Sequence, residues 1–134
     1  MPLHSFRTIM WWSETDAAGI AHFSSIFKLC EWAEESYLEK LLGPRFREAT
    51  SLSVIFPRVH ASCDFKRPIY AHDWVRVDIV GVRVGETSIT WEFEVYDESM
   101  GWLSARCKIV TVAVDRGKMQ KVRVPDELRK ILEG

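Results

Sequence analysis

The segment from Thr15 to Phe23 holds the residues whose type and order point most directly to chemistry. It reads Thr-Asp-Ala-Ala-Gly-Ile-Ala-His-Phe and leads into a predicted long helix. The first backbone N–H groups of a helix lack partners within it and carry roughly half a positive charge. A carboxylate at Asp16 could attack a carbonyl bound by these groups, or activate water against it, and Gly19 permits the tight backbone path between them. The spacing equally allows Asp16 simply to cap a turn.

Other familiar catalytic patterns are missing from the sequence. It contains no G-x-S-x-G, G-x-x-x-x-G-K-[ST], G-x-G-x-x-G or H-E-x-x-H, so nothing indicates a serine hydrolase elbow, a nucleotide loop or a zinc protease. The histidines are scattered. His60 and Asp64 share one strand face, but two potential ligands make a poor metal site. We therefore expect neither a metal nor a resident cofactor.

One long helix is predicted from Ser24 to Leu42. Apolar residues fall within an arc of about 120° when residues are placed about 100° apart, and charged residues occupy the opposite side. Ser24 or Ser25 is expected to cap the first turn, and Gly43-Pro44 to end the helix. The apolar arc predicts one buried face, formed by Ile26, Leu29, Cys30, Ala33, Tyr37 and Leu41.

Alternating apolar and polar residues predict strands in most of the remaining chain. They are expected over residues 3–12, 59–65, 74–84, 89–96 and 103–114, with a last edge strand over 118–124. A change of apolar parity predicts a bulge at Gly81. Pro125-Asp126 is expected to start a short terminal helix. Consecutive strands with a single long helix indicate an α+β fold, in which an antiparallel sheet packs on the helix's apolar face.

Length and composition indicate a single domain over residues 1–134. The net charge is −1 and 47% of the residues are hydrophobic. A chain of this length buries about two-thirds of its unfolded surface and needs no disulfide or metal to fold. The balanced charge argues against nucleic-acid binding, and no apolar run approaches the ~20 residues of a membrane span. The N-terminus lacks the features of a secretory signal. We expect a soluble, cytoplasmic protein that binds neither nucleic acid nor membrane.

The cysteines also favour a cytoplasmic protein. Cys30, Cys63 and Cys107 are odd in number, far apart and without a C-x-x-C pair. Each lies in an apolar-periodic segment, so we expect all of them to be buried thiols of the core.

Residues 15–20, Thr-Asp-Ala-Ala-Gly-Ile, resemble the active-site region of hot-dog-fold acyl-CoA thioesterases, in the branch that contains 4-hydroxybenzoyl-CoA thioesterase. Phe23-Ser24-Ser25 and Glu31-Trp32-Ala33-Glu34 continue the resemblance. Lys66-Arg67-Pro68 with Asp73 following, and Thr87-Ser88 at a strand start, extend it over nearly the whole chain. It implies a hot-dog fold, whose sheet wraps around the long helix.

The resemblance also implies an activity, the hydrolysis of a small or aromatic acyl-CoA to free acid and coenzyme A. Asp16 would be the nucleophile or general base, Gly19 would allow the turn, and the Phe23 N–H would polarise the thioester carbonyl. Coenzyme A would enter only as part of the substrate. A thiol's pKa near 8.5 makes the thiolate a good leaving group, so this small constellation can suffice without a Ser-His-Asp triad.

In that family two subunits join their sheets edge to edge, and the site forms between them. The resemblance therefore implies a homodimer or homotetramer. The phosphates of coenzyme A would need Lys66, Arg67 or Arg83, and Thr87 is expected beside the substrate as well.

The sequence departs from the family pattern at several positions. Several members have a histidine where Phe23 stands, whereas here it is one residue earlier; His22 either faces the site or fills a core gap. Members often have Arg in place of Glu34. Glu34 is a second candidate carboxylate at the margin of the buried arc, and Glu31 lies farther from it.

Two other functions are compatible with the same residues. A hydratase or dehydratase would use Asp16 and His22 as an acid/base pair, and His22→Ala would then abolish turnover. A non-catalytic acyl-CoA-binding module would release no thiol, and Asp16→Asn would change only its affinity.

Overall fold

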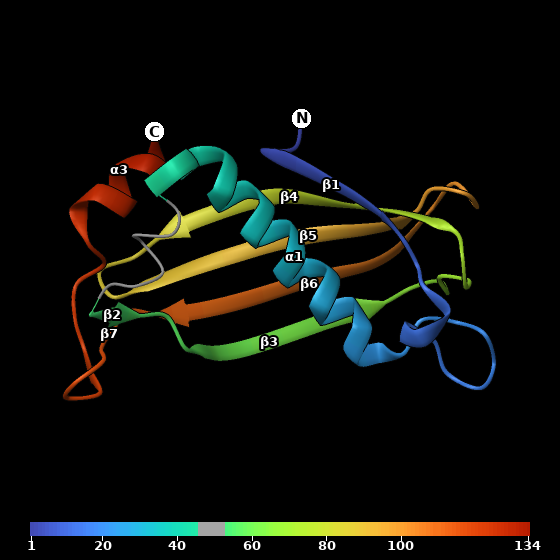
Figure 1. Ribbon diagram of the computed structural model, residues 1–134, viewed down its shortest axis with the longest axis horizontal. Helices are drawn as coiled ribbons and strands as arrows, with labels where there is room; N and C mark the ends of the chain where they lie inside the picture. Colours follow the sequence, from blue (N-terminus) through green and yellow to red (C-terminus); the bar gives the residue numbers. More distant parts are fainter. Residues whose placement is uncertain (46–52) are drawn as a thin grey trace.

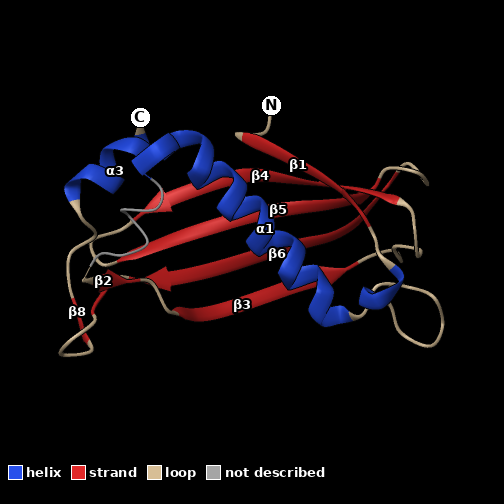
Figure 2. Cartoon of the chain, in the orientation of Figure 1, coloured by secondary structure: helices blue, strands red, loops and turns tan. Residues whose placement is uncertain are grey.

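The computed structural model describes residues 1–45 and 53–134. A five-stranded antiparallel sheet of order β1-β4-β5-β6-β3 curves around helix α1, and a small sheet of order β2-β7-β8 lies with helix α3 toward one end (Figure 1, Figure 2). This is the predicted α+β hot-dog architecture. The elements are β1 (His4–Ile9), η1 (Trp12–Glu14), α1 (Phe23–Leu42), η2 (Gly43–Arg45), β2 (Val54–Ile55), β3 (Arg58–Phe65), β4 (Trp74–Val84), β5 (Ser88–Asp97), β6 (Trp102–Val112), β7 (Val114–Asp115), β8 (Gln120–Lys121) and α3 (Asp126–Glu133).

Helix α1 begins one residue earlier than predicted. Its N-cap is His22 rather than a serine, because the His22 ring accepts the Ser24 N–H at 3.2 Å on Nδ1. The Ser25 hydroxyl is engaged instead by the preceding loop. The helix ends at Gly43 as predicted, where φ is +58° and the Gly43 N–H donates to the Glu39 carbonyl. Of the predicted apolar face, Ile26, Leu29, Cys30 and Ala33 are buried, and Tyr37 and Leu41 are half-buried against the core.

The core lies between α1 and the inner face of the sheet. Trp91 and Phe93 of β5 are among its largest fully buried side chains, and β6 runs between β5 and β3. The predicted bulge is present, since the β4–β5 register shifts between Ile79 and Gly81. The core strands supply Val75, Val77, Ile79, Ile89, Trp91, Phe93, Val95, Ala105, Cys107 and Ile109.

The strand predicted over residues 59–65 is confirmed as β3, in which Val59 and Phe65 are 59% and 54% exposed. The reason is lateral position, because β3 is the edge of the sheet and has only β6 beside it. The predicted strand over 118–124 is reduced to Gln120–Lys121, which pairs with β7.

The prediction of three core thiols was wrong for two of them. Cys63 and Cys107 form a disulfide, and only Cys30 is a free buried thiol among the described residues. The physical reason is register, since the two cysteines face each other on the neighbouring strands β3 and β6. Their separation of 44 residues concealed this contact in the sequence.

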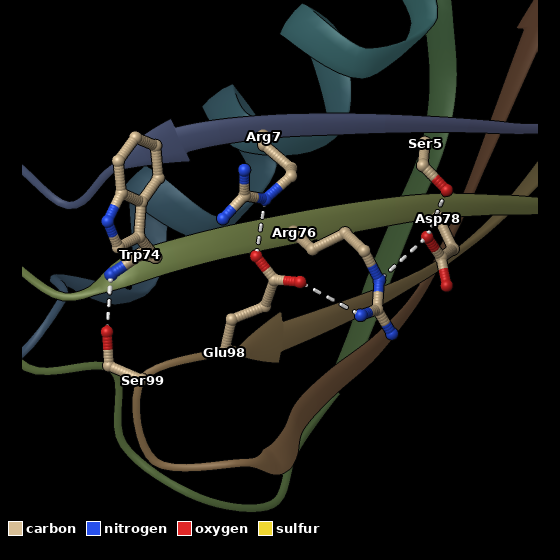
Figure 3. A network of polar contacts seen from close by, with 7 residues as sticks. All are labelled: Ser5, Arg7, Trp74, Arg76, Asp78, Glu98 and Ser99. Atoms are coloured by element: carbon tan, nitrogen blue, oxygen red, sulfur yellow. Dashed lines mark hydrogen bonds and ion pairs between the residues drawn. The ribbon is translucent and has the colours of Figure 1, made fainter.

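A network of polar contacts covers the outer face of the sheet near β1 (Figure 3). Arg76 bonds both Asp78 and Glu98 at 3.1 Å, and Arg7 bonds Glu98 at 2.6 Å. Ser5 donates to Asp78 at 2.7 Å. These contacts tie β1 to β4 and to the residue after β5. They therefore fix the strand that leads into the candidate site.

Candidate active site

The chain between β1 and α1 forms a closed loop. After the turn of η1, Thr15 pairs with Ala21, and the Asp16 N–H donates to the Ile20 carbonyl at 2.8 Å. The tip of the loop contains Gly19, whose φ is +78°. A Cβ at this position would meet no atom within 4 Å, so glycine is required there by backbone conformation alone.

The Asp16 carboxylate combines a turn contact with a free oxygen. Its Oδ1 accepts the Ala18 N–H at 2.8 Å, which is the turn-capping role that the spacing allowed. Its Oδ2 has neither a hydrogen bond nor a cation partner within residues 1–45 and 53–134. The side chain is exposed. Capping a turn therefore leaves one oxygen available to react.

The segment after β3 supports this loop. Ile20 pairs with Tyr70, the Ala21 N–H donates to the Ile69 carbonyl at 2.8 Å, and the Ala71 N–H donates to the Gly19 carbonyl at 3.1 Å. The backbone on either side of the Gly19 turn is thus held by the segment after β3 as well as by hydrogen bonds within the loop.

With partners counted over the described residues, the start of α1 presents one unpaired backbone donor. The Ser24 N–H is bound by the His22 ring, and the Ser25 N–H donates to the His22 carbonyl at 2.9 Å. The Phe23 N–H has no acceptor in the part of the chain that the structure describes. The Phe23 side chain is exposed and contacts His22, with ring centroids 4.7 Å apart and the ring planes tilted by 32°. A carbonyl oxygen can be bound at this N–H.

His22 does not fill a core gap, because its side chain is exposed. Its Nδ1 is used in capping α1 and lies 2.8 Å from the Ser24 hydroxyl. The ring therefore has a structural role at the start of the helix.

The other candidate carboxylates are engaged by cations. Glu34 is buried, and Arg58 of β3 lies 2.5 Å from it and 3.3 Å from Glu31. Burial raises the pKa of Glu34, and the hydrogen bond from Arg58 opposes that shift. The ion pair ties α1 to the edge strand.

Sequence reasoning missed Glu14. Its carboxylate contacts Ser25 and Lys28 of α1. The separations of 11 and 14 residues follow no local period that would have indicated these contacts, because they depend on how the loop folds back.

The predicted coenzyme A contacts divide between the two ends of the sheet. Lys66 and Arg67 follow β3, at the end where the Asp16 loop lies (Figure 1). Arg83, near the end of β4, and Thr87, before β5, lie at the opposite end. Arg67 lies over the Trp102 ring, with 5.0 Å from its Cζ to the centroid. One copy of the chain does not bring these four residues together.

A hollow of about 500 Å³ lies elsewhere, between β1 and α1. None of the predicted site residues lines it; its walls are His4, Phe6, Trp32, Glu35, Ser36, Glu39 and Lys40. No described helix is both long and apolar enough to cross a membrane.

A five-stranded antiparallel sheet curved around one long helix is the architecture of the hot-dog fold. The sequence profile of the Thioesterase-like superfamily matches residues 10–132. The chain belongs to this superfamily and is an acyl-CoA thioesterase.

Two curated relatives carry the same name. The chain is 32% identical to the 1,4-dihydroxy-2-naphthoyl-CoA hydrolase of Nostoc punctiforme, over 95% of this chain and 84% of the relative. It is 30% identical to the enzyme of that name from Rippkaea orientalis, over 90% of this chain and 88% of the relative. These relatives favour hydrolysis over the hydratase and binding-module alternatives.

Solved structures share the fold over almost the full length. A 1,4-dihydroxy-2-naphthoyl-CoA thioesterase from Synechocystis superposes with a TM-score of 0.86 at 21% identity, covering 96% of this chain and 94% of that one. A gentisyl-coenzyme A thioesterase gives 0.81 at 23% identity, covering 96% and 98%. At these identities the likeness establishes the fold alone.

Proposed function

We propose that this thioesterase hydrolyses 1,4-dihydroxy-2-naphthoyl-CoA, or a closely similar aromatic acyl-CoA. The names of the curated relatives support this substrate. So do the exposed aromatic side chains of Trp11, Trp12 and Phe23, which flank the Asp16 loop. Aromatic side chains of this kind offer flat apolar surface to a bicyclic acyl group.

In the proposed reaction, the thioester oxygen is bound by the Phe23 N–H at the start of α1. The free Oδ2 of Asp16 attacks the carbonyl carbon, the C–S bond breaks, and coenzyme A leaves as a thiolate that takes up a proton. Water then hydrolyses the acyl–Asp16 anhydride and restores the carboxylate. As a general base, Asp16 would instead take a proton from the water that attacks the thioester directly. Either route releases one acid and one thiol.

One observation carries this proposal. A carboxylate with a free oxygen lies in the closed loop that leads directly into the unpaired N–H at the start of α1, within the described residues. The loop is fixed by bonds from Asp16 to Ile20 and from Thr15 to Ala21. Donors that are already oriented stabilise a developing oxyanion without reorganisation, at about 3–4 kcal/mol for each donor.

The test is thiol release from a panel of thioesters: 1,4-dihydroxy-2-naphthoyl-, benzoyl-, acetyl- and octanoyl-CoA. We expect the naphthoyl substrate to give the highest kcat/KM, and Asp16→Asn to lower kcat by at least about 1,000-fold. The matched control is Asp126→Asn, an exposed aspartate at the start of α3.

The outcomes separate the parts of the proposal. Full activity of Asp16→Asn would refute the role of Asp16. A preference for acetyl- or octanoyl-CoA would refute the aromatic substrate class while leaving the thioesterase chemistry intact.

We also propose that two copies pair through the exposed edge of β3. The apolar side chains left open there support this, as does the position of Arg83 and Thr87 at the far end of the sheet from the Asp16 loop. A second copy would bring its own Arg83 and Thr87 toward the Asp16 loop, from which these two residues are too far away within one chain.

A further inference from the structure

Glu14 links the candidate loop to the first turns of α1, and the chemistry proposed for Asp16 does not use it. The Ser25 hydroxyl lies 2.9 Å from Glu14 Oε2, and Lys28 Nζ lies 2.9 Å from Oε1 and 3.2 Å from Oε2. Ser25 is only 2% exposed, and the Glu14 side chain is 21% exposed. Hydrogen bonds from Lys28, then from Ser25, lower the pKa of Glu14. The carboxylate is therefore an ionised anchor with both oxygens occupied.

The backbone of Glu14 reinforces this anchor. Its carbonyl accepts the Ser25 hydroxyl at 2.8 Å and the His22 N–H at 3.0 Å. Glu14 stands just before the Thr15–Ala21 pair, and His22 stands just after it. One residue thus holds both ends of the loop together and fastens them to the helix.

Glu14 lies close in sequence to both groups of the proposed reaction. Asp16 lies two residues after Glu14, and Phe23 follows His22. The Asp16 carboxylate and the Phe23 N–H therefore lie on the two sides of the backbone bond between Glu14 and His22, so the contacts of Glu14 affect the position of both. A misplacement of about 1 Å between reacting groups can cost on the order of 100-fold in rate.

We propose that Glu14 is a positioning residue, which sets the Asp16 carboxylate against the Phe23 N–H by binding Ser25 and Lys28. This inference rests on the proposed function. Glu14 is not itself the reacting carboxylate, because Ser25 and Lys28 occupy its oxygens, whereas Asp16 keeps Oδ2 free.

The experiment compares kcat and KM for Glu14→Ala, Glu14→Gln and Ser25→Ala, with 1,4-dihydroxy-2-naphthoyl-CoA as substrate. We expect Glu14→Ala to lower kcat at least about tenfold while KM changes less than about threefold, because alignment and not binding is lost. Glu14→Gln keeps an acceptor for Ser25 and should recover part of the rate. Glu14→Ala combined with Ser25→Ala should be no slower than the slower single variant, because both break one link.

The matched control is Glu127→Gln. Glu127 forms an exposed ion pair with Arg45, just beyond the other end of α1, 2.5 Å between Arg45 Nη1 and Glu127 Oε1. This change should leave kcat unaltered. Melting temperatures of all variants are measured beside the rates, so that loss of folded protein is separated from loss of alignment. Should Glu14→Ala not fold, Glu14→Gln and Ser25→Ala carry the same comparison.

The results distinguish the two proposals. A wild type that releases thiol, with Glu14 and Ser25 variants at wild-type kcat, overturns the inference alone. An effect confined to KM, or a kcat loss of equal size in Glu127→Gln, overturns it too. A wild type inert on every thioester overturns the proposed function, and this inference with it.

Discussion

A buried aspartate with a second aspartate beside it holds the segment that supports the Asp16 loop. Asp97 is fully buried and accepts N–H groups from Tyr70 at 3.2 Å and Met100 at 3.0 Å. Burial first, then a hydrogen bond and charge repulsion from Asp97, raise the pKa of Asp73 to about 6. Asp73 Oδ2 is buried and has no hydrogen-bond partner among the described residues. Because Tyr70 pairs with Ile20, the Asp97 carboxylate helps to hold the backbone that lies against the Asp16 loop.

This pair predicts a pH dependence of stability. The usual pKa of an aspartate is near 3.8, so between about pH 4 and about pH 6 folded Asp73 keeps a proton that the unfolded chain has lost. The free energy of unfolding contributed by this group therefore falls as the pH rises through that window. Asp73→Asn cannot ionise, so its stability relative to wild type should increase across the window and then stay constant. Partial exposure limits the gain to on the order of 1–2 kcal/mol.

Urea unfolding from about pH 4 to about pH 8 measures this difference. Asp126→Asn, in the exposed first turn of α3, serves as the control. Its free energy of unfolding relative to wild type should not show the increase between about pH 4 and about pH 6 that is expected of Asp73→Asn. An Asp73→Asn offset that is the same at every pH would show that the wild-type carboxyl titrates normally.

At the scale of elements, the apolar periodicity and the turn residues predicted those features that are set by residues close together in the sequence. The buried arc of α1, its end at Gly43 and the bulge at Gly81 were all predictable, because each follows from residues a few positions apart. The order of strands across the sheet is set by contacts between distant residues. The edge position of β3 therefore could not be predicted from its alternation, and neither could the Cys63–Cys107 contact.

The same distinction between nearby and distant contacts applies to the candidate site. Asp16 and Gly19 were identified from one short segment, since the loop they build closes on itself. Glu14 and the Arg58–Glu34 pair were not identified, because each depends on a fold that brings distant residues together. Local spacing could indicate the candidate carboxylate but not the contacts that hold its loop in place.

The disulfide predicts a redox-dependent stability. Because Cys63 and Cys107 are 44 residues apart, their bond constrains the unfolded chain, and its loss should lower the free energy of unfolding by about 2–4 kcal/mol. Chemical unfolding with and without dithiothreitol measures this effect. The Cys63→Ser/Cys107→Ser variant is the control and should not respond to the reductant. A thiol count of three in the denatured, unreduced wild type, instead of one from Cys30, would contradict the disulfide.

At the scale of the whole molecule, β3 presents backbone groups that have no hydrogen-bond partner within residues 1–45 and 53–134. The Cα atoms of Cys63 and Cys107 are 4.1 Å apart, the spacing of a pair that exchanges no backbone hydrogen bonds. The Lys66 N–H, by contrast, donates to the Ser104 carbonyl of β6 at 2.7 Å. By alternation, Ala61, Cys63 and Phe65 therefore direct their backbone groups toward the open edge. An unprotected edge strand is a template for pairing with another chain.

Antiparallel pairing of two β3 strands about a twofold axis would reverse one molecule relative to the other. The end that carries the Asp16 loop of one copy would then approach the end that carries Arg83 and Thr87 of its partner (Figure 1). We therefore predict that activity depends on the dimer. Ala61→Pro removes an N–H that faces the open edge and takes no bond from the β6 ladder, so it should give a folded monomer with kcat/KM at least about tenfold lower.

Light scattering after gel filtration measures the mass, and thiol release measures the activity of the same fractions. Ala61→Val is the matched control, because it keeps the N–H and favours a strand, and it should remain a dimer at wild-type activity. A wild type that is monomeric at assay concentration would refute the dimer. A monomeric Ala61→Pro with full activity would show instead that one chain completes the site, and that the charges at the far end of the sheet serve no substrate.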